Sequence, residues 1–314
     1  MNLSLQDSNN NNSKGVSYTS GFFMLLGFAL LGLVVASFIS IGLVTSVAGG
    51  KIQEAMKDPA NADLIRIMQV SSMVISMFIP AIAVAYLLNR KPFRLLGFRS
   101  NVTVSQVVIV VALMFLALFV AGAFGVVNKE IADAFGLKGW SEKLEKTYNE
   151  QVAIMLDMKS LSGYFISLFV MAFVPAVCEE MLFRGGLQNF LTRATKNPWT
   201  SVIIVSIIFS LVHFSAYAFL VRIFLGLMLG LIYHYTQNIW LCIMAHFFNN
   251  ALAVSSVYFM MQQGKGMEEA MSKEISAAYW GFLALPLIFI LFKSLRKNSP
   301  VDEAPAAVNQ ETHY

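Results

Sequence analysis

Long runs of apolar residues dominate this chain, and short polar segments separate them. A helix crosses the hydrocarbon core of a bilayer with about 20 consecutive apolar residues. The runs lack the alternating pattern of barrel strands, and backbone groups in lipid must bond within their own segment, so the runs predict helices. We expect an all-α, polytopic membrane protein with about eight transmembrane helices, at 22–47, 67–88, 104–127, 163–190 (interrupted), 199–214, 218–235, 239–261 and 277–292.

The composition supports this interpretation. Hydrophobic residues make up 57% of the chain and charged residues 13%, whereas soluble domains have about 45–50% and about 25%. A disordered chain, a coiled coil and most soluble enzymes are therefore excluded. The two cysteines exclude a disulfide scaffold. The net charge of +4 is small and scattered, so we expect the lipid bilayer as a partner and no nucleic acid.

The polar segments divide the chain into five regions. The loop at 128–160 contains a mixture of glutamate and lysine at Ser141–Glu150, which predicts a short surface helix. This helix is either a solvated connector or a lid over a site. The five regions are a disordered tail at 1–20, a three-helix membrane region at 21–160 that includes the outer loop 128–160, a polar-containing core at 161–261, a final helix region at 262–297 and a tail at 298–314.

Basic residues in the short loops predict the orientation. The loop at 89–103 has four basic residues and no acid, and the segment after the last span is also basic. Arginine and lysine gather in cytoplasmic loops. With eight spans, both termini lie on one side of the membrane, and we expect both in the cytoplasm.

Ionisable and amide side chains inside the predicted spans are concentrated in the second half of the chain. Such residues cost about 2.5–3.5 kcal/mol each on insertion scales and usually serve a function. Arg222, near the end of a span, is expected instead to extend to the membrane surface. The candidates for a functional site are Glu179, Glu180, Arg184, His213, His246 and Asn250.

Helix geometry groups these side chains. Glu180 and Arg184 are four residues apart, with the acid first, which favours an ion pair. Glu179 is turned about 100° from Glu180, so it is the freer carboxylate and is suited to act as a general base. His246 and Asn250 also share one face, and Phe209 is placed to pack against His213.

The depths of these residues in the membrane also agree. At 1.5 Å per residue, Glu179 and His213 lie about 18 and 21 Å from the same side, and His246 and Asn250 about 10 and 16 Å. Adjacent helices could therefore bring them together, which predicts an active site in the membrane core between helices 4, 5 and 7. A carboxylate with an imidazole activates water, and a second imidazole with an amide stabilises an oxyanion. The combination predicts hydrolysis inside the membrane.

Three motifs resemble those of a known family. They are Glu179-Glu180-x-x-x-Arg184, Phe209-x-x-x-His213 and His246-x-x-x-Asn250. In this order they resemble the CAAX protease and bacteriocin-processing (CPBP, or Abi) family, which includes the type II CAAX prenyl endopeptidases. The resemblance covers about residues 160–255, so region 161–261 would be the catalytic core.

The resemblance implies an intramembrane endopeptidase acting on a membrane-associated peptide or protein, with a prenylated or otherwise lipidated chain as one candidate. Glu179 and His213 would activate water, and His246 and Asn250 would stabilise the oxyanion. Glu180, Arg184 and Phe209 would support them. We expect the plasma (inner) membrane of a bacterium as its location.

The sequence does not decide whether the site holds a metal ion. The family has been described both as metalloproteases and as metal-free glutamate proteases. Glu179, His213 and His246 have the composition of a His₂Glu zinc site, but the compact His-Glu-x-x-His spacing is absent. We favour the metal-free glutamate chemistry over a zinc site.

Two other functions use the same residues. One is an ion- or proton-coupled transporter, although the internal repeats typical of transporters are not evident. The other is a non-catalytic membrane scaffold or immunity protein.

Overall fold

The computed structural model describes residues 14–49, 51–156, 158, 160–215, 217–265 and 278–299. Within these ranges the chain forms helices and connecting turns and no strand, which confirms the all-α prediction. The tails predicted at 1–20 and 298–314 lie mostly outside the described residues. In chain order the long elements are α1 (Tyr18–Ala48), α3 (Ala62–Met73), α4 (Ile79–Leu88), α6 (Val104–Ala134), α7 (Lys138–Met155), α8 (Leu161–Leu168), α9 (Val174–Glu180), α10 (Asn189–Thr195), α11 (Pro198–Leu211), α12 (Phe219–Thr236), α13 (Ile239–Gln262) and α15 (Leu285–Lys297).

Short segments join or interrupt these helices. Ser17 caps the start of α1, because its hydroxyl accepts a hydrogen bond from the Ser20 N–H at 3.0 Å. The predicted final span begins as a 3₁₀ turn and continues as α15. The short segments are α2 (Ile52–Ala55), η2 (Pro59–Asn61), η3 (Val74–Phe78), α5 (Pro92–Leu95), η4 (Phe169–Phe173), η5 (Met181–Gln188) and η6 (Ala278–Ala284).

The described residues contain seven helices that are long and apolar enough to cross a membrane. Together with the charge pattern, they identify an integral, multi-pass membrane protein. The fifth predicted run becomes the shorter apolar helix α11. Its 14 residues extend about 21 Å, which is less than the hydrocarbon thickness of about 30 Å. The side that faces the cytoplasm stays a prediction.

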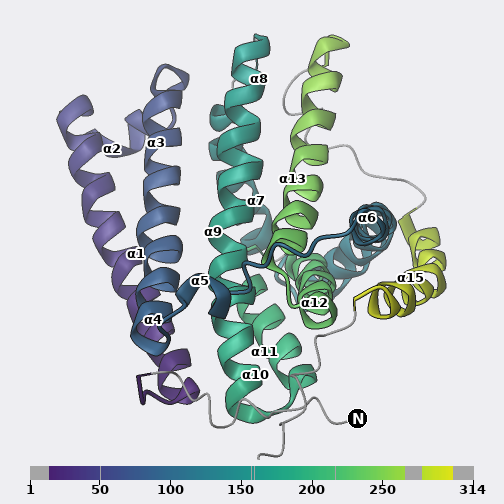
Figure 1. The fold of residues 1–314 in the computed structure, drawn as a ribbon. Helices are drawn as coiled ribbons and strands as arrows, with labels where there is room; N and C mark the ends of the chain where they lie inside the picture. The colour runs from purple at the N-terminus through teal and green to yellow at the C-terminus, as the bar shows by residue number, and fades with distance from the viewer. Residues whose placement is uncertain are drawn as a thin grey trace, which may run out of the picture.

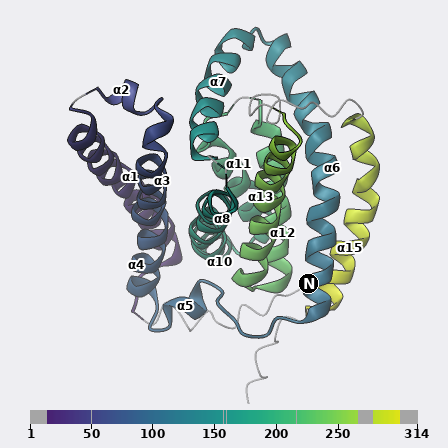
Figure 2. The same ribbon diagram turned by 90° about the horizontal axis from the view of Figure 1, so that it is seen from above.

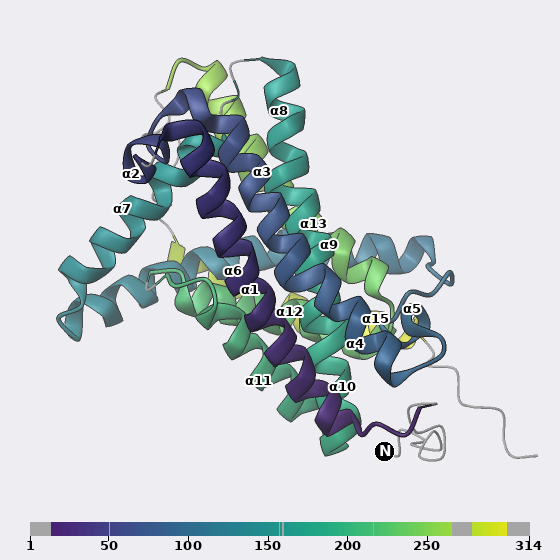
Figure 3. The same ribbon diagram turned by 90° about the vertical axis from the view of Figure 1, so that its left-hand side faces the viewer.

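A long central helix organises the molecule. Elements α8, η4, α9, η5 and α10 follow one another as one rod that runs vertically in Figure 1. Helices α1, α3 and α4 lie on one side of it and beside one another, as Figure 3 also shows. On the other side, α6 and α12 are seen end-on in Figure 1 and along their length in Figure 2, so they cross the rod steeply.

Two apolar cores flank this rod. One is formed by α6, α12, α13 and α15 and contains fully buried residues such as Leu113 and Ile232. The other joins α1, α4, η5 and α10 around residues such as Leu25 and Phe190. The intramembrane polar side chains of α9, η5 and α13 therefore lie between two packed apolar cores.

Small residues allow helices α11 and α12 to approach closely. A Cβ atom on Gly226 would lie 3.0 Å from Ser206 Cβ and 3.1 Å from Ser206 Cα. One turn later, a Cβ atom on Gly230 would lie 3.0 Å from a methyl group of Val202. Small residues four apart are a common means of close packing between membrane helices. This contact brings the end of α11, which precedes His213, next to the start of α12.

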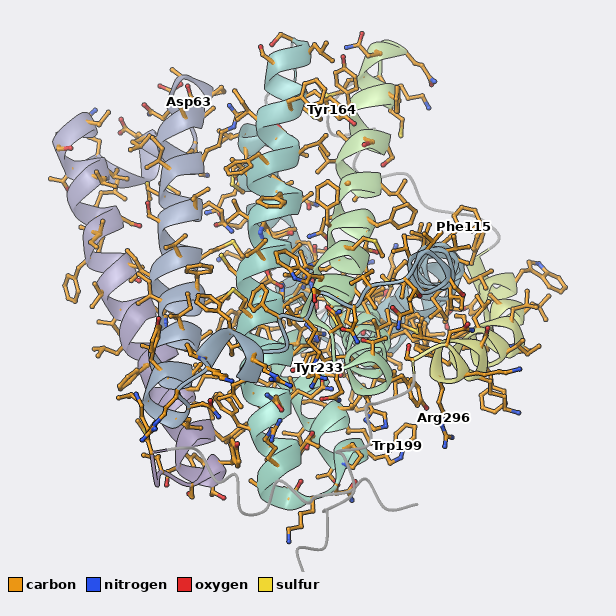
Figure 4. The ribbon with its side chains drawn as sticks, in the orientation of Figure 1. Asp63, Phe115, Tyr164, Trp199, Tyr233 and Arg296 are labelled. Carbon is orange, nitrogen blue, oxygen red and sulfur yellow. The ribbon has the colours of Figure 1, made fainter. Side chains whose placement is uncertain are left out.

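Aromatic side chains tie α8 to α13 at the opposite end of the molecule. Tyr164 Oη lies 2.8 Å from Ser255 Oγ, and its ring stacks on Tyr258 with centroids 4.4 Å apart. Figure 4 shows Tyr164 far from Trp199, which marks the start of α11. Because these contacts join α8 to α13, they fix the distance between the rod and α13 at the α8 end, beyond the polar residues of α9.

Candidate active site

The rod departs from regular α-helix on both sides of the predicted catalytic residues. The π-helical segments η4 and η5 flank the seven-residue helix α9, which ends with Glu179 and Glu180. Pro175 lies in the first turn of α9, where its missing N–H removes one helical hydrogen bond. Wide π turns inside helices are frequent at functional sites. The sequence predicts that this span is interrupted, and the structure locates the irregularity in two π turns.

Glu180 and its partners are joined through Glu180 Oε1, whereas Glu180 Oε2 and Arg184 Nε are buried without a hydrogen-bond partner among the described residues. Arg184 Nη1 and His246 Nδ1 both lie 2.8 Å from Glu180 Oε1. Arg184 Nη2 also donates to the Gly226 carbonyl at 3.2 Å. Glu180 and Arg184 are 0% exposed and His246 is 6% exposed. The ion pair expected from the sequence is therefore present, and His246 is held by the same carboxylate oxygen.

Glu179 faces the two histidines differently. Its Oε2 atom lies 3.8 Å from His213 Nε2 and 3.9 Å from His246 Nε2, beyond the range of a hydrogen bond. Glu179 is 6% exposed, and its Oε2 atom is buried with no hydrogen-bond partner among the described residues. A buried acceptor of this kind is rare in native proteins and calls for a functional explanation. One carboxylate oxygen and two imidazole nitrogens therefore converge on one space.

The remaining nitrogen of each imidazole fixes its orientation. His213 Nδ1 lies 2.6 Å from the Phe209 carbonyl oxygen, which can only accept, so Nδ1 carries the proton. The ionised Glu180 carboxylate likewise only accepts from His246 Nδ1. In the neutral form of each ring, Nε2 is then the unprotonated nitrogen. Both histidines thus present the same tautomer to Glu179.

The Phe209 ring contacts both histidines and Arg184. Its ring centroid lies 4.8 Å from that of His213 and 6.1 Å from that of His246. The Arg184 guanidinium carbon lies 4.8 Å from the same centroid, a distance suited to a cation–π contact. The predicted packing of Phe209 on His213 is confirmed, and the ring also separates Arg184 from the cavity.

A cavity of about 950 Å³ opens in front of these groups, near the upper end of the range for ligand pockets. Glu179, Phe209, His213, His246 and Asn250 line it, whereas Glu180 and Arg184 do not. The side-chain oxygen Oδ1 of Asn250 accepts a hydrogen bond from Asn249 Nδ2 at 3.2 Å. This contact orients the Asn250 amide and leaves its own Nδ2 group available as a donor. The structure therefore brings all the predicted catalytic residues to one cavity.

Helix α7 supplies a wall of the cavity, which agrees with the second of the two roles considered for the predicted surface helix. Figure 2 shows α7 looping back from the end of α6 toward the central rod. Its residues Tyr148, Gln151 and Met155 line the cavity. Glu145 of α7 accepts a hydrogen bond from the hydroxyl of Ser215, two residues after His213. The predicted surface helix exists, and one of its faces covers the site.

Arg222 also lies elsewhere than expected. The sequence predicts that this side chain extends to the membrane surface. Instead, it lines the cavity with Glu179 and His213. Its Nη1 atom is buried and has no hydrogen-bond partner among the described residues. A single basic residue near a span end gives no signal from which this inward placement could have been predicted.

The residues fit a zinc ion only in composition. Glu179, His213 and His246 are a His₂Glu set. However, the part of the chain that the structure describes contains no group of three His, Cys, Asp or Glu side chains arranged to hold a metal ion. We therefore derive no step through zinc.

Fold and site together define the class: a multi-pass membrane protein with a carboxylate and two imidazoles at an internal cavity. Residues 161–252 match the family model described as type II CAAX prenyl endopeptidase Rce1-like. The matched segment runs from the start of α8 into α13 and contains all the predicted site residues. It confirms the resemblance and supports a CAAX-type intramembrane protease in general, with a peptide or protein substrate in the membrane. No curated protein and no solved structure matches the chain significantly.

Proposed function

We propose that this protein is an intramembrane endopeptidase in which Glu179 and His213 activate the attacking water. The observation that carries the proposal is the convergence of Glu179 Oε2 with His213 Nε2 at 3.8 Å and His246 Nε2 at 3.9 Å. A water oxygen about 2.8 Å from each of two such atoms bridges this separation. The Glu179 carboxylate and the unprotonated His213 Nε2 are both acceptors, so they draw protons from that water.

The reaction then needs one proton transfer in each direction. Glu179 accepts a proton as the water oxygen bonds to the peptide carbonyl carbon, and a tetrahedral oxyanion forms. Breakage of the carbon–nitrogen bond follows, and the proton passes from Glu179 or His213 to the leaving amine. The new carboxylic acid then gives its proton to the amine, so the products are one carboxylate and one ammonium group, and the atoms and charges balance.

Asn250 and His246 are the proposed donors to the oxyanion. The Asn250 amide is oriented by Asn249 and lines the cavity. His246 donates from Nε2 when it is protonated, and Glu180 then holds the opposite ring nitrogen. Donors fixed in advance, in a site with little water, stabilise developing charge more strongly than they do in water.

We propose the metal-free glutamate form of this mechanism. Two observations support it: one water spans the space between Glu179 Oε2 and the two Nε2 atoms, and the described residues contain no group of three His, Cys, Asp or Glu side chains arranged to hold a metal ion. The expected result is that a chelator leaves the rate unchanged and that purified active protein contains no stoichiometric zinc by elemental analysis. Loss of activity in chelator with recovery on adding zinc would contradict this form.

The substrate is proposed to be a membrane-associated peptide or protein, with a lipidated or prenylated chain as one candidate. Apolar side chains, among them Met114, Met171 and Met260, make up much of the cavity wall. Flexible methionine side chains adapt to varied apolar shapes. We further propose a bacterial plasma (inner) membrane, with both termini in the cytoplasm.

The test is hydrolysis in water enriched in ¹⁸O. The purified protein in nanodiscs is incubated with a panel of membrane-tethered peptides, with and without prenyl groups, and the products are identified by mass spectrometry. Hydrolysis places one ¹⁸O atom in the new carboxylate, and His213→Gln lowers the rate by about 100-fold or more. The exposed residue Glu142 of α7 provides the control, since Glu142→Gln should keep the wild-type rate. Peptides that stay intact, or cross the bilayer uncut, would contradict the proposal.

A further inference from the structure

Two glutamine side chains line the cavity and have no part in the proposed hydrolysis. Gln69 lies in α3 and Gln151 lies in α7, and both line the cavity together with Glu179. Both come before residues 161–252, the segment that matches the family model. The family match therefore assigns no role to either side chain.

The amide groups of these two glutamines are unpaired. Neither side chain forms a hydrogen bond with any residue that the structure describes. In contrast, Asn249 and Asn250, which also line the cavity, are bonded to each other at 3.2 Å. Gln69 is half-buried and lies in a segment that is apolar enough to cross a membrane. An amide that loses water without gaining a hydrogen bond is costly, so a polar group that enters the cavity would relieve this cost.

A buried arginine holds together the two helices that carry these glutamines. Arg66 of α3 is 7% exposed, and its Nε atom donates to the carbonyl of Met155, the last residue of α7, at 3.0 Å. Gln69 follows Arg66 by about one helical turn. Gln151 precedes Met155 by about one turn as well. Both amides are therefore anchored at one contact between α3 and α7.

A peptide that presents a bond to Glu179 also presents its main chain to the cavity wall. Each residue of an extended segment carries an N–H and a C=O group that need partners away from water. We infer that Gln69 and Gln151 bind the main chain of an extended peptide substrate beside the bond that is cut, which rests on the proposed function. A primary amide has two N–H donors and one carbonyl acceptor, so it can pair with both groups of a peptide unit.

This subsite recognises a conformation rather than a side chain. Main-chain N–H and C=O groups are present in every residue except proline, which lacks the N–H. In an α-helix these groups are already bonded to one another, so a helical segment offers the two amides no partner. Gln69 and Gln151 therefore select a segment of the substrate that is locally unwound, and they position it without contacting the reacting atoms.

The test measures binding, so that it does not depend on hydrolysis. In the Glu179→Gln background, dissociation constants are measured for fluorescent membrane-tethered peptides in which one main-chain amide at a time is replaced by an ester. The ester removes the N–H donor and weakens the carbonyl acceptor. At one or two positions it should weaken binding by about two- to tenfold, as expected for a hydrogen bond. Gln69→Leu should abolish the penalty at one of these positions, and Gln151→Leu should abolish it at the same or the other position. The exposed Gln262 at the end of α13 is the matched control, because Gln262→Leu should keep every penalty.

Equal binding of the all-amide peptide and every ester peptide would overturn the inference, and this measurement needs no variant at either glutamine to fold. No measurable binding of any peptide would overturn it as well. If the ester penalties persist in both Gln69→Leu and Gln151→Leu, the two amides bond only to cavity water and the inference is also wrong. Failure of the proposed function is separate, because it appears as a wild-type protein that cleaves no peptide while the glutamines still respond to the esters.

Discussion

Two neighbouring carboxylates on one helix have opposite surroundings. Glu180 accepts hydrogen bonds from Arg184 and His246, both at 2.8 Å, and does not line the cavity. Glu179 lines the cavity, and its Oε2 atom has no hydrogen-bond partner among the described residues. Both side chains are buried. Burial therefore does not distinguish the two acids, and neither does an unpaired Oε2 atom, which both have. They differ because Glu180 is paired through Oε1 and only Glu179 lines the cavity.

This difference suggests a division of labour. A buried carboxylate that is paired with an arginine and a histidine holds these neighbours in place, and its removal leaves them uncompensated. A buried carboxylate with an unused oxygen beside two imidazoles is available to exchange a proton. His246 links the two, because its Nδ1 faces Glu180 and its Nε2 faces Glu179. Variants of Glu180 and Arg184 therefore test the structural half of the site, and variants of Glu179 and Asn250 test the reactive half.

The largest effect on stability is expected at Glu180. Glu180→Gln leaves the Arg184 charge uncompensated in a buried position, so the free energy of unfolding should fall by about 3–5 kcal/mol. Denaturant unfolding of the purified protein in detergent measures this change. The double variant Glu180→Gln/Arg184→Gln should recover part of the loss. An unfolding midpoint equal to that of the wild type would show that the pair does not hold the site.

A smaller effect, on rate rather than stability, is expected at Asn250. Asn250→Ala removes a proposed oxyanion donor, so kcat should fall by about 100- to 1,000-fold with little change in KM. The exposed Asn149 of α7 gives a matched control, and Asn149→Ala should behave as the wild type. A rise in KM at constant kcat would instead indicate that Asn250 only binds substrate.

The smallest effect is expected at the contact between α7 and the loop that follows α11. Glu145→Ala removes the acceptor of the Ser215 hydroxyl, so the loop that carries His213 should be less well fixed. A hydrogen bond contributes about 0.5–1.5 kcal/mol, which corresponds to a two- to tenfold fall in kcat. Steady-state kinetics measure this change, and Glu142→Ala on the same helix serves as the control. Equal rates for the two variants would mean that α7 is a passive cover.

Much of the site could be predicted because helix geometry is local. The spacing of Glu180 and Arg184 defines an i, i+4 pair wherever that helix lies. Counting residues from the ends of the spans places Glu179, His213 and His246 at compatible depths. The i, i+4 spacing and the depth along a helix are both properties of a single helix, so they can be predicted without knowing how the helices pack. The same is true of the hydropathy pattern, which identifies the helices themselves.

The remaining features depend on rotations and contacts between helices, which spacing does not specify. The bond from His246 to Glu180 depends on how α13 is turned relative to α9. The inward placement of Arg222 depends on α7 packing over the start of α12. The short length of α11 reflects a helix that ends before His213, although the apolar run continues to residue 214.

The most direct test of the central claim is the rate of Glu179→Gln on a peptide that the wild type cleaves. This change keeps the shape of the side chain and removes its basic oxygen, while the Glu180 group is left intact. We predict a fall in kcat of about 10⁴-fold with the wild-type unfolding midpoint. A folded Glu179→Gln protein that cleaves at a rate close to the wild type's would contradict the claim that Glu179 activates the water.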